Sequence, residues 1–342
     1  MHFVLSVDVM SGDHGLKITI PACIKYLKDN NNVNLILVGD SKQIYSYLGN
    51  NINQFINRIE VVNATQVVEM NESPHLALRN KKDSSMRVAI EQVKNKRADC
   101  IVSSGNTGAL MAISRYLLRT IEGIDRPAIA KILPTINGEV CVLDLGANIK
   151  SSPQQLLQFG IMGTHLIKAV SNKKKPTIGL LNVGTEDIKG DETIKEACEL
   201  LKKSNLNFYG YVEGDDITKG TVDVIVCDGF TGNVALKTIE GVAKMISLIL
   251  KQSFSNSIIS KIMAMIVFPI LNKIKHRLDP RKYNGAILLG LNGVVIKSHG
   301  SADSLAFYYA LDQAKHEVSG GVINLLSNYI QENKTIKLND LE

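Results

Sequence analysis

The 342-residue sequence contains no tryptophan, and aromatic residues make up only 5% of it. Zinc-finger spacings and RNP-like aromatic motifs are also missing. Modules that stack on bases or read grooves depend on such features, so we expect no nucleic-acid partner. The net charge of +6 indicates other acidic partners, such as anionic lipid or an acidic protein.

Cysteine is scarce, and the five residues form no CxxC pair, which is typical of reduced core residues and not of a metal site or a disulfide framework. The nucleotide signatures GxxxxGK[ST] and GxGxxG are missing too, which disfavours ATP and NAD. Without GxSxG or HExxH, a serine hydrolase or a zinc protease is equally disfavoured. We expect neither a cofactor nor a metal.

Long hydrophobic runs are also missing, since no stretch approaches the roughly 20 apolar residues that span a bilayer. The first residues, Met1 to Asp8, lack a basic leader, and Asp8 interrupts their apolar run. This pattern predicts a first strand instead of a secretory signal, and therefore a cytoplasmic protein.

Short β-rich runs alternate with longer helical patterns along the chain. Such alternation is typical of βαβ units around a mainly parallel sheet, and the nearly continuous apolar runs indicate strands covered on both faces. We expect one α/β domain over residues 1–330 and a frayed polar tail over 331–342. The predicted strands are residues 4–9, 34–38, 100–103, 140–145, 177–181, 224–227 and 294–297.

Small and polar residues follow many of these strands. Because ligands bind at the carboxyl ends of strands in open α/β sheets, we expect these turns to gather at one edge of the sheet. The turn Ser104, Gly105, Asn106, Thr107 lies between a strand and a helix, where backbone N–H groups and hydroxyls suit a small anion. Ordinary helix capping is the alternative for this turn.

Four further turns carry candidate groups. Lys189 lies between two glycines, where it would neutralise a phosphate or an oxyanion, although a surface ion pair is the simpler interpretation. Asn233 lies at a helix entry, for which capping is again the alternative. His14 and His299 fall in glycine-rich loops, where a base or a hydrogen-bond donor would be useful, although turn histidines are often structural.

Residues 254–282 have the composition of a hairpin that lies on a membrane. Ile258, Ile262, Met265 and Ile266 recur at helical spacing, and basic residues surround the apolar run. The alternative is a helical hairpin that packs into a dimer core or lies over the sheet, with its lysines reaching water.

Several long blocks of the sequence resemble the PlsX-type phosphate acyltransferases of bacterial phospholipid synthesis. Ser11 departs from the double-glycine turn that is common in that family. The matching blocks are residues 8–15, 81–89, 104–109, 143–148, 227–237 and 297–301.

The resemblance implies a three-layer α/β/α fold with a mixed, mostly parallel sheet, similar to isopropylmalate dehydrogenases and phosphotransacetylases. It also implies two intertwined halves and a homodimer. The implied enzyme reversibly transfers a long-chain fatty acyl group from acyl carrier protein to inorganic phosphate. The acyl phosphate then feeds a membrane glycerol-3-phosphate acyltransferase, which implies peripheral association with the inner face of the cell membrane.

Within that reaction we expect phosphate to bind at the Ser104 turn, at Asn148 and at Asn233. Lys189 would stabilise the oxyanion, and His299 would donate a hydrogen bond. Four basic residues are candidates for docking the acidic carrier protein, although each is equally a solvated surface charge. These are Lys17, Lys81, Lys82 and Arg87.

Two alternatives stay open at this point. A phosphotransacetylase-like enzyme would act on short acyl-CoA and would leave the hairpin at 254–282 without a lipid role. A non-enzymatic scaffold at the membrane surface would tolerate substitutions in the strand-end turns.

Overall fold

The computed structural model describes residues 2–171, 173–255, 267, 269 and 279–339. All eleven strands join one sheet in the order β3-β2-β1-β4-β11-β10-β5-β6-β9-β7-β8. The strands are β1 (Phe3–Asp8), β2 (Val33–Gly39), β3 (Ile59–Asn63), β4 (Cys100–Ser103), β5 (Ala128–Thr135), β6 (Gly138–Leu143), β7 (Thr177–Leu181), β8 (Asn207–Val212), β9 (Val224–Val226), β10 (Ala286–Leu289) and β11 (Val294–Lys297).

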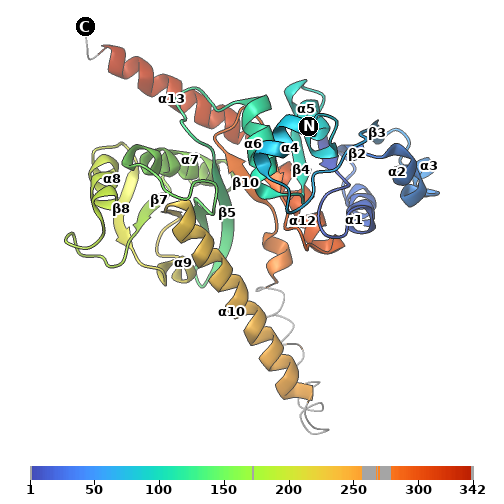
Figure 1. Ribbon diagram of the computed structural model, residues 1–342. Coiled ribbons are helices and arrows are strands. Elements are labelled where there is room, and N and C mark those ends of the chain that lie inside the picture. Colours follow the sequence, from blue (N-terminus) through green and yellow to red (C-terminus); the bar gives the residue numbers. More distant parts are fainter. Residues whose placement is uncertain (1, 172, 256–266, 268, 270–278, 340–342) are drawn as a thin grey trace.

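Helices cover both faces of the sheet, so the predicted three-layer architecture and mixed sheet are confirmed (Figure 1). One hydrophobic core holds α1, α2, α7, α8, α12 and α13 against one face, and the other holds α4, α5, α6 and α10. The helices are α1 (Leu16–Asp29), α2 (Ser41–Leu48), α3 (Asn51–Gln54), α4 (Pro74–Asn80), α5 (Ser85–Lys94), α6 (Thr107–Leu118), α7 (Pro153–Ser171), α8 (Glu192–Lys202), α9 (Asp216–Lys219), α10 (Gly229–Ser255), η1 (Pro280–Tyr283), α12 (Ser304–Gly320) and α13 (Val322–Asn339).

All seven predicted strands are present, with ends that differ by at most two residues. Four strands were missed: β3, β5, β8 and β10. Three of the missed strands lack a continuous apolar run: β3 contains Glu60, β5 contains Lys131 and Pro134, and β8 is an edge strand with alternating burial. Tertiary pairing, not local pattern, establishes these three strands. The fourth, β10, is a short apolar run that we did not assign as a strand.

The strand directions divide the sheet into two halves. β10 is antiparallel to both β11 and β5, and β5 is antiparallel to β6. The strands β1, β4 and β11 therefore run in the opposite direction to β6, β9 and β7. The register nevertheless places the carboxyl ends of both sets in one row across the sheet, since Ile296 of β11 lies opposite Ile287, Ile287 opposite Ala130, and Ala130 opposite Leu143 of β6. The turns leave this row in two opposite directions, so they do not share one edge as we expected.

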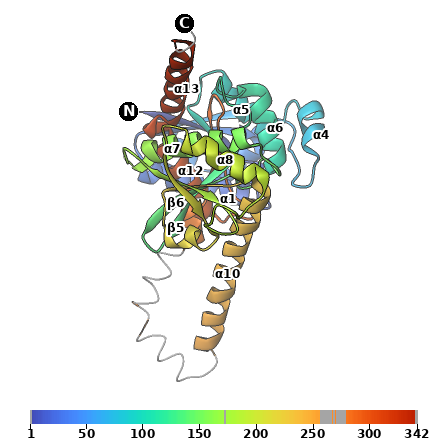
Figure 2. The ribbon, with the colours of Figure 1, turned by 90° about the vertical axis from the view of Figure 1, so that its left-hand side faces the viewer.

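The helix α10 begins at the edge where β9 ends and projects well beyond the body of the molecule (Figures 1 and 2). The predicted membrane-facing residues Ile258, Ile262, Met265 and Ile266 follow it and lie outside the described residues. Among the helices of the described part of the chain, none is both long and apolar enough to cross a membrane.

The C-terminal helices pack on the face that carries α1 and α7. Gly321 ends α12 with a φ of 66°, in the left-handed region that glycine adopts without strain. The next helix, α13, runs into the polar segment 331–342, so the tail that we expected to fray is helical as far as Asn339.

Candidate active site

The carboxyl ends of β1, β4 and β11 bring three loops together. Asp8 is the last residue of β1 and is fully buried. One of its carboxylate oxygens accepts hydrogen bonds from the hydroxyls of Ser11 and Ser103, the latter at 2.7 Å. Burial raises the pKa of Asp8, although these hydrogen bonds act in the opposite direction. This carboxyl joins the loop after β1 to the end of β4.

Glycine is required where these loops meet. Gly12 has a φ of 89°, and a Cβ there would lie only 2.5 Å from the Ser104 hydroxyl oxygen and 3.1 Å from the Gly300 carbonyl oxygen. The backbone N–H of Asp13 donates to that same carbonyl at 2.9 Å. The three loops therefore pack together through backbone, which leaves only a narrow pocket between them.

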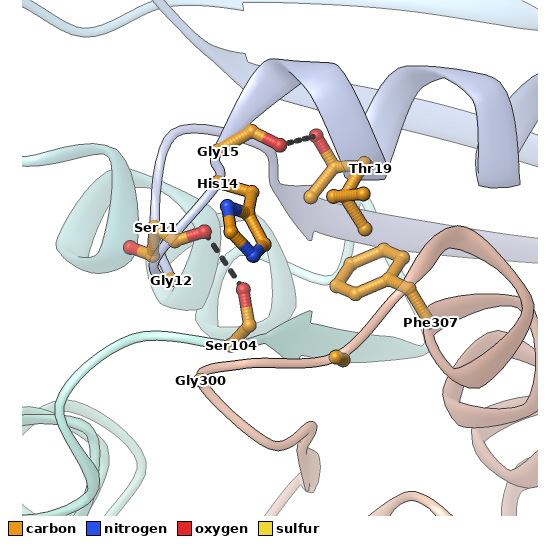
Figure 3. Close-up of a pocket in the computed structure, with 10 residues that line it drawn as sticks. Ser11, Gly12, His14, Gly15, Thr19, Ser104, Gly300 and Phe307 are labelled. Atoms are coloured by element: carbon orange, nitrogen blue, oxygen red, sulfur yellow. Dashed lines mark hydrogen bonds between the residues drawn. The ribbon is translucent and has the colours of Figure 1, made fainter. Parts of the chain in front are cut away.

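This pocket has a volume of about 10 Å³. Figure 3 shows the His14 ring, the Ser11–Ser104 hydrogen bond and Phe307 around it. A space of this size holds about one water molecule, so any substrate would meet this site from its open side. The lining residues are Ser11, Gly12, His14, Gly15, Ile18, Thr19, Ser104, Gly300, Ala302 and Phe307.

The predicted anion turn after β4 has most of its side chains engaged. The Ser104 hydroxyl donates to the Ser11 carbonyl at 2.7 Å. Asn106 caps α6 by accepting from the Ala109 N–H at 3.0 Å, and its amide donates to the Met70 and Glu72 carbonyls. The capping alternative thus accounts for the Asn106 side chain. The first N–H groups of α6 have no acceptor within the helix and remain suited to an anion.

Lys297 ends β11 directly beside this turn. Its ammonium donates to the carbonyl of Ser104 at 3.4 Å and to that of Ser298. Burial and the nearby Lys237 lower the pKa of Lys297 to about 8. A charged residue at the last position of an apolar strand is the signal that marks both Lys297 and Asp8, and we did not predict a role for either of them.

His299 follows two residues later in an exposed position. Its Nδ1 accepts a hydrogen bond from the Ser301 N–H at 3.2 Å. A backbone N–H only donates, so in the neutral ring the proton lies on Nε2, which is then a donor. Burial and Lys237 lower the pKa of His299, so this neutral form prevails at physiological pH.

The helix α10 also contributes charged groups to this region. Glu240 pairs with Lys131 of β5 at 3.3 Å and with Lys237 at 3.0 Å. Lys237 and Glu240 both influence the pKa of His299, which places this part of α10 near the loop after β11. The pairing of Lys131 with Glu240 joins α10 to the central strands.

A second cluster lies where β6 ends, in the other half of the sheet. The buried carboxyl of Asp144 accepts from the N–H groups of Ile129 at 3.0 Å and Asn148 at 2.7 Å. The Asn148 amide donates to Asp144 at 2.9 Å and to the Pro127 carbonyl at 2.9 Å. These bonds fix the loop after β6. The Asn148 side chain therefore shapes this loop from a buried position.

Asn233 and Lys189 follow β9 and β7, which lie in the same half of the sheet as β6. Asn233 is exposed on the first turn of α10 and faces Gly146, where a Cβ would lie 3.6 Å from the Asn233 Cβ. Lys189 is exposed in the loop after β7, and its side chain folds over Gly184. The structure thus groups Asn148 with Asn233, and Asn233 lies about one helical turn before Lys237, whose charge acts on Lys297 and His299. Lys189 and Ser104 follow strands that run in opposite directions.

A family model described as "Fatty acid synthesis protein" matches residues 3–325. The chain belongs to this family. The phosphate acyltransferase of Chromobacterium violaceum is 56% identical to it over 94% of each chain. The phosphate acyltransferase of Methylococcus capsulatus is 52% identical, over 93% of this chain and 94% of its own.

Solved structures show that the family shares its fold with other enzymes. A phosphotransacetylase from Streptococcus pyogenes superposes with a TM-score of 0.61 at 16% identity, over 94% of both chains. The EutD phosphotransacetylase from Staphylococcus aureus gives 0.58 at 15% identity, again over 94% of both chains. This likeness confirms the predicted phosphotransacetylase-like fold.

Proposed function

We propose that this protein is a phosphate acyltransferase that moves a long-chain fatty acyl group from acyl carrier protein to inorganic phosphate. The observation that carries this conclusion is the similarity to phosphate acyltransferases over nearly the whole chain. The strand-end loops around Ser104 and Lys297 supply the anion-binding chemistry that such a reaction needs. The acyl phosphate would enter phospholipid synthesis.

In the proposed reaction, a phosphate oxygen attacks the thioester carbonyl carbon. The new C–O bond forms as the C–S bond breaks, and the leaving thiolate takes up the proton that the phosphate loses. No covalent enzyme intermediate is needed, because positioning the phosphate beside the thioester supplies much of the acceleration. We assign phosphate binding to the backbone N–H groups of the Ser104–Thr107 turn and to Asn233, beside the loop that the buried Asn148 holds in place. We assign oxyanion stabilisation to Lys189 and His299.

A carrier protein also needs a docking surface, for which we propose an open groove of about 580 Å³ beside α6. It is lined by Leu78, Ala112, Arg115, Tyr116 and Arg119. Both arginines are exposed, and the guanidinium of Arg87 lies 5.7 Å from the centre of the Tyr116 ring. The basic charge suits an acidic protein surface.

The groove lies on the helix whose N-terminus carries the anion turn. Arg115 is eight residues beyond Thr107, which is about 12 Å along a helix axis. A carrier docked at this groove would therefore direct its thioester arm along α6 toward Ser104. Of the predicted docking lysines, Lys81 is bound to Glu72 and to the Val67 carbonyl, whereas Lys17 and Lys82 are exposed.

We further propose a homodimer that associates with the anionic inner surface of the cell membrane. In this location it would supply a membrane glycerol-3-phosphate acyltransferase. The support is the projecting half of α10, where several large apolar side chains are exposed on a helix that leaves the body. These are Val242, Met245, Ile246, Leu248, Ile249 and Leu250.

The test is phosphate-dependent loss of a long-chain acyl carrier protein thioester by the purified full-length protein. Mass spectrometry would detect the acyl phosphate, and palmitoyl-CoA and acetyl-CoA would serve as alternative donors. We expect acyl phosphate from the carrier-bound donor. Efficient turnover of acetyl-CoA alone would favour a phosphotransacetylase, and no turnover of any donor would reject an acyltransferase.

A further inference from the structure

Basic side chains from three elements share one region near the end of β11. Lys131 comes from β5, Lys237 from α10, and Lys297 and His299 from β11 and the loop after it. Lys237 lowers the pKa of both Lys297 and His299, and Lys131 lowers that of His299. Glu240 lies 3.3 Å from Lys131 and 3.0 Å from Lys237, and the sheet register places Ala130, next to Lys131, in the row of Ile296, next to Lys297. The basic groups therefore share one region of the molecule.

The neighbouring carboxylates do not pair with Lys297. Glu240 is held between Lys131 and Lys237 at 3.3 and 3.0 Å. Lys237 lowers the pKa of Lys297 more than either Asp13 or Asp8 alone raises it, and the Asp8 carboxyl is engaged by two serine hydroxyls. Lys297 thus lies near two carboxylates without being ion-paired to either of them.

The Lys297 ammonium contacts only carbonyl oxygens within the described residues, those of Ser104 and Ser298. Carbonyl dipoles orient an ammonium but supply no full countercharge. Removing a charge from water without an opposite charge is unfavourable, as the lowered pKa of Lys297 indicates. An anion bound next to Lys297 would supply the missing countercharge.

We propose that Lys297, Lys237 and His299 bind a phosphate group beside the Ser104 turn. The two ammonium groups supply charge, His299 donates from Nε2, and the first N–H groups of α6 add donors. This inference rests on the proposed acyl transfer, which brings a phosphate group in two forms. One is inorganic phosphate, and the other is the phosphodiester of the carrier's pantetheine arm.

The first measurement is calorimetric binding of sulfate, which remains a dianion throughout the pH range that lysine titrates. We expect Lys297→Met to weaken sulfate binding at pH 7 by about tenfold or more, the usual effect of losing a charged hydrogen bond. The matched control is Lys315→Met. Lys315 is also partly buried and bonds a neutral oxygen, Asn30 Oδ1 at 2.8 Å, but it lies on α12 outside the site.

The pH dependence separates a binding role from a structural one. Since the pKa of Lys297 is about 8, its charge and the affinity for sulfate should fall as the pH rises through that value. Lys297→Arg stays charged, so its affinity should persist to about pH 9.5. The titratable and charged groups that face Lys297 and His299 are Lys131, Lys237, Glu240, Asp8 and Asp13.

Steady-state kinetics identify the source of the phosphate group. If inorganic phosphate binds here, Lys297→Met raises the KM for phosphate by about tenfold and leaves the KM for the thioester unchanged. If the pantetheine phosphate binds here, the variant weakens acyl-phosphopantetheine as a donor and leaves acyl-pantetheine, which has no phosphate, unaffected.

Unchanged sulfate binding by folded Lys297→Met would overturn the proposal. If Lys297→Met does not fold, two other variants decide. The proposal would also be overturned if the sulfate affinity of Lys297→Arg still fell near pH 8 and Lys237→Met bound sulfate with wild-type affinity. The acyl transfer is judged separately. If the wild-type protein binds sulfate through Lys297 but forms no acyl phosphate, the anion site stands and the proposed acyl transfer is wrong.

Discussion

Glu317 of α12 is a carboxyl buried completely within the chain. Gln313 donates to one of its oxygens at 2.5 Å, and the other has no partner among the described residues. Burial raises the pKa of Glu317 to about 8. The folded protein therefore holds a proton on Glu317 at neutral pH, whereas the unfolded chain releases it at the usual glutamate pKa of about 4.3.

This difference makes stability depend on pH. The raised pKa destabilises the fold increasingly as the pH rises from about 4.3 to about 8, because folding must take up a proton there, and the effect is constant above that range. We expect Glu317→Gln to be more stable than the wild type by roughly 2–4 kcal/mol at pH 8 and about equal at pH 4. Urea unfolding at both pH values measures this, and an equal difference at both would contradict it.

Among individual residues, the sequence alone identified some members of the site and missed others. Ser104 and His299 lie at the expected loops because glycine and small polar residues mark a strand end by themselves. The roles of Lys297 and Asp8 depend on distances to Ser104 and Ser103, residues that are remote from them in the sequence. Such distances follow from the pairing of β1, β4 and β11 and have no local signature.

Among the elements, α6 ends in an unusual conformation. Arg119 has φ 60° and ψ 170°, a region that is nearly exclusive to glycine and costs about 1–3 kcal/mol for other residues. The Asn292 N–H donates to the Arg119 carbonyl, and its amide donates to the carbonyls of Leu118 and Thr120. The loop between β10 and β11 thus holds this strained residue in place, with its side chain in the basic groove.

Arg119→Gly should stabilise the protein and impair carrier docking. We expect a gain of about 1 kcal/mol, because relief of strain exceeds the entropy that glycine adds to the unfolded chain. The KM for acyl carrier protein should rise several-fold at low salt, while the KM for acyl-pantetheine stays unchanged.

Arg119→Ala is the matched control for this prediction, since it removes the charge but keeps the strain. It should raise the KM for the carrier to the same extent without the gain in stability, as measured by urea unfolding. A carrier KM that is unaffected in both variants would remove the groove from the docking surface.

At the scale of the whole molecule, the large apolar side chains exposed on the projecting half of α10 indicate an interface, because exposed apolar patches usually mark one. We expect Ile246→Glu combined with Ile249→Glu to weaken the dimer in sedimentation velocity, to abolish flotation with anionic vesicles, or both. Each residue is about half exposed on α10, at 49% and 51%, so its replacement should not unfold the body.

The control is Lys251→Glu on the same exposed helix, which changes charge without removing apolar surface. It should keep the dimer and reduce vesicle binding only through electrostatics, an effect that salt removes. If the double variant keeps both the wild-type dimer and vesicle binding, this half of α10 serves neither interface.

The sequence by itself determined the α/β class, the seven apolar strands and the loops that follow them, because hydrophobic periodicity and small residues at turns act locally. The tertiary structure decided which loops meet. The central antiparallel strands β5 and β10 make β4 and β11 run against β6, β7 and β9, and they bring the carboxyl ends of both sets into one row. Pairing direction and register depend on residues far apart in the chain, so only the folded sheet joins Lys297 with Ser104 and brings Lys237 of α10 near them.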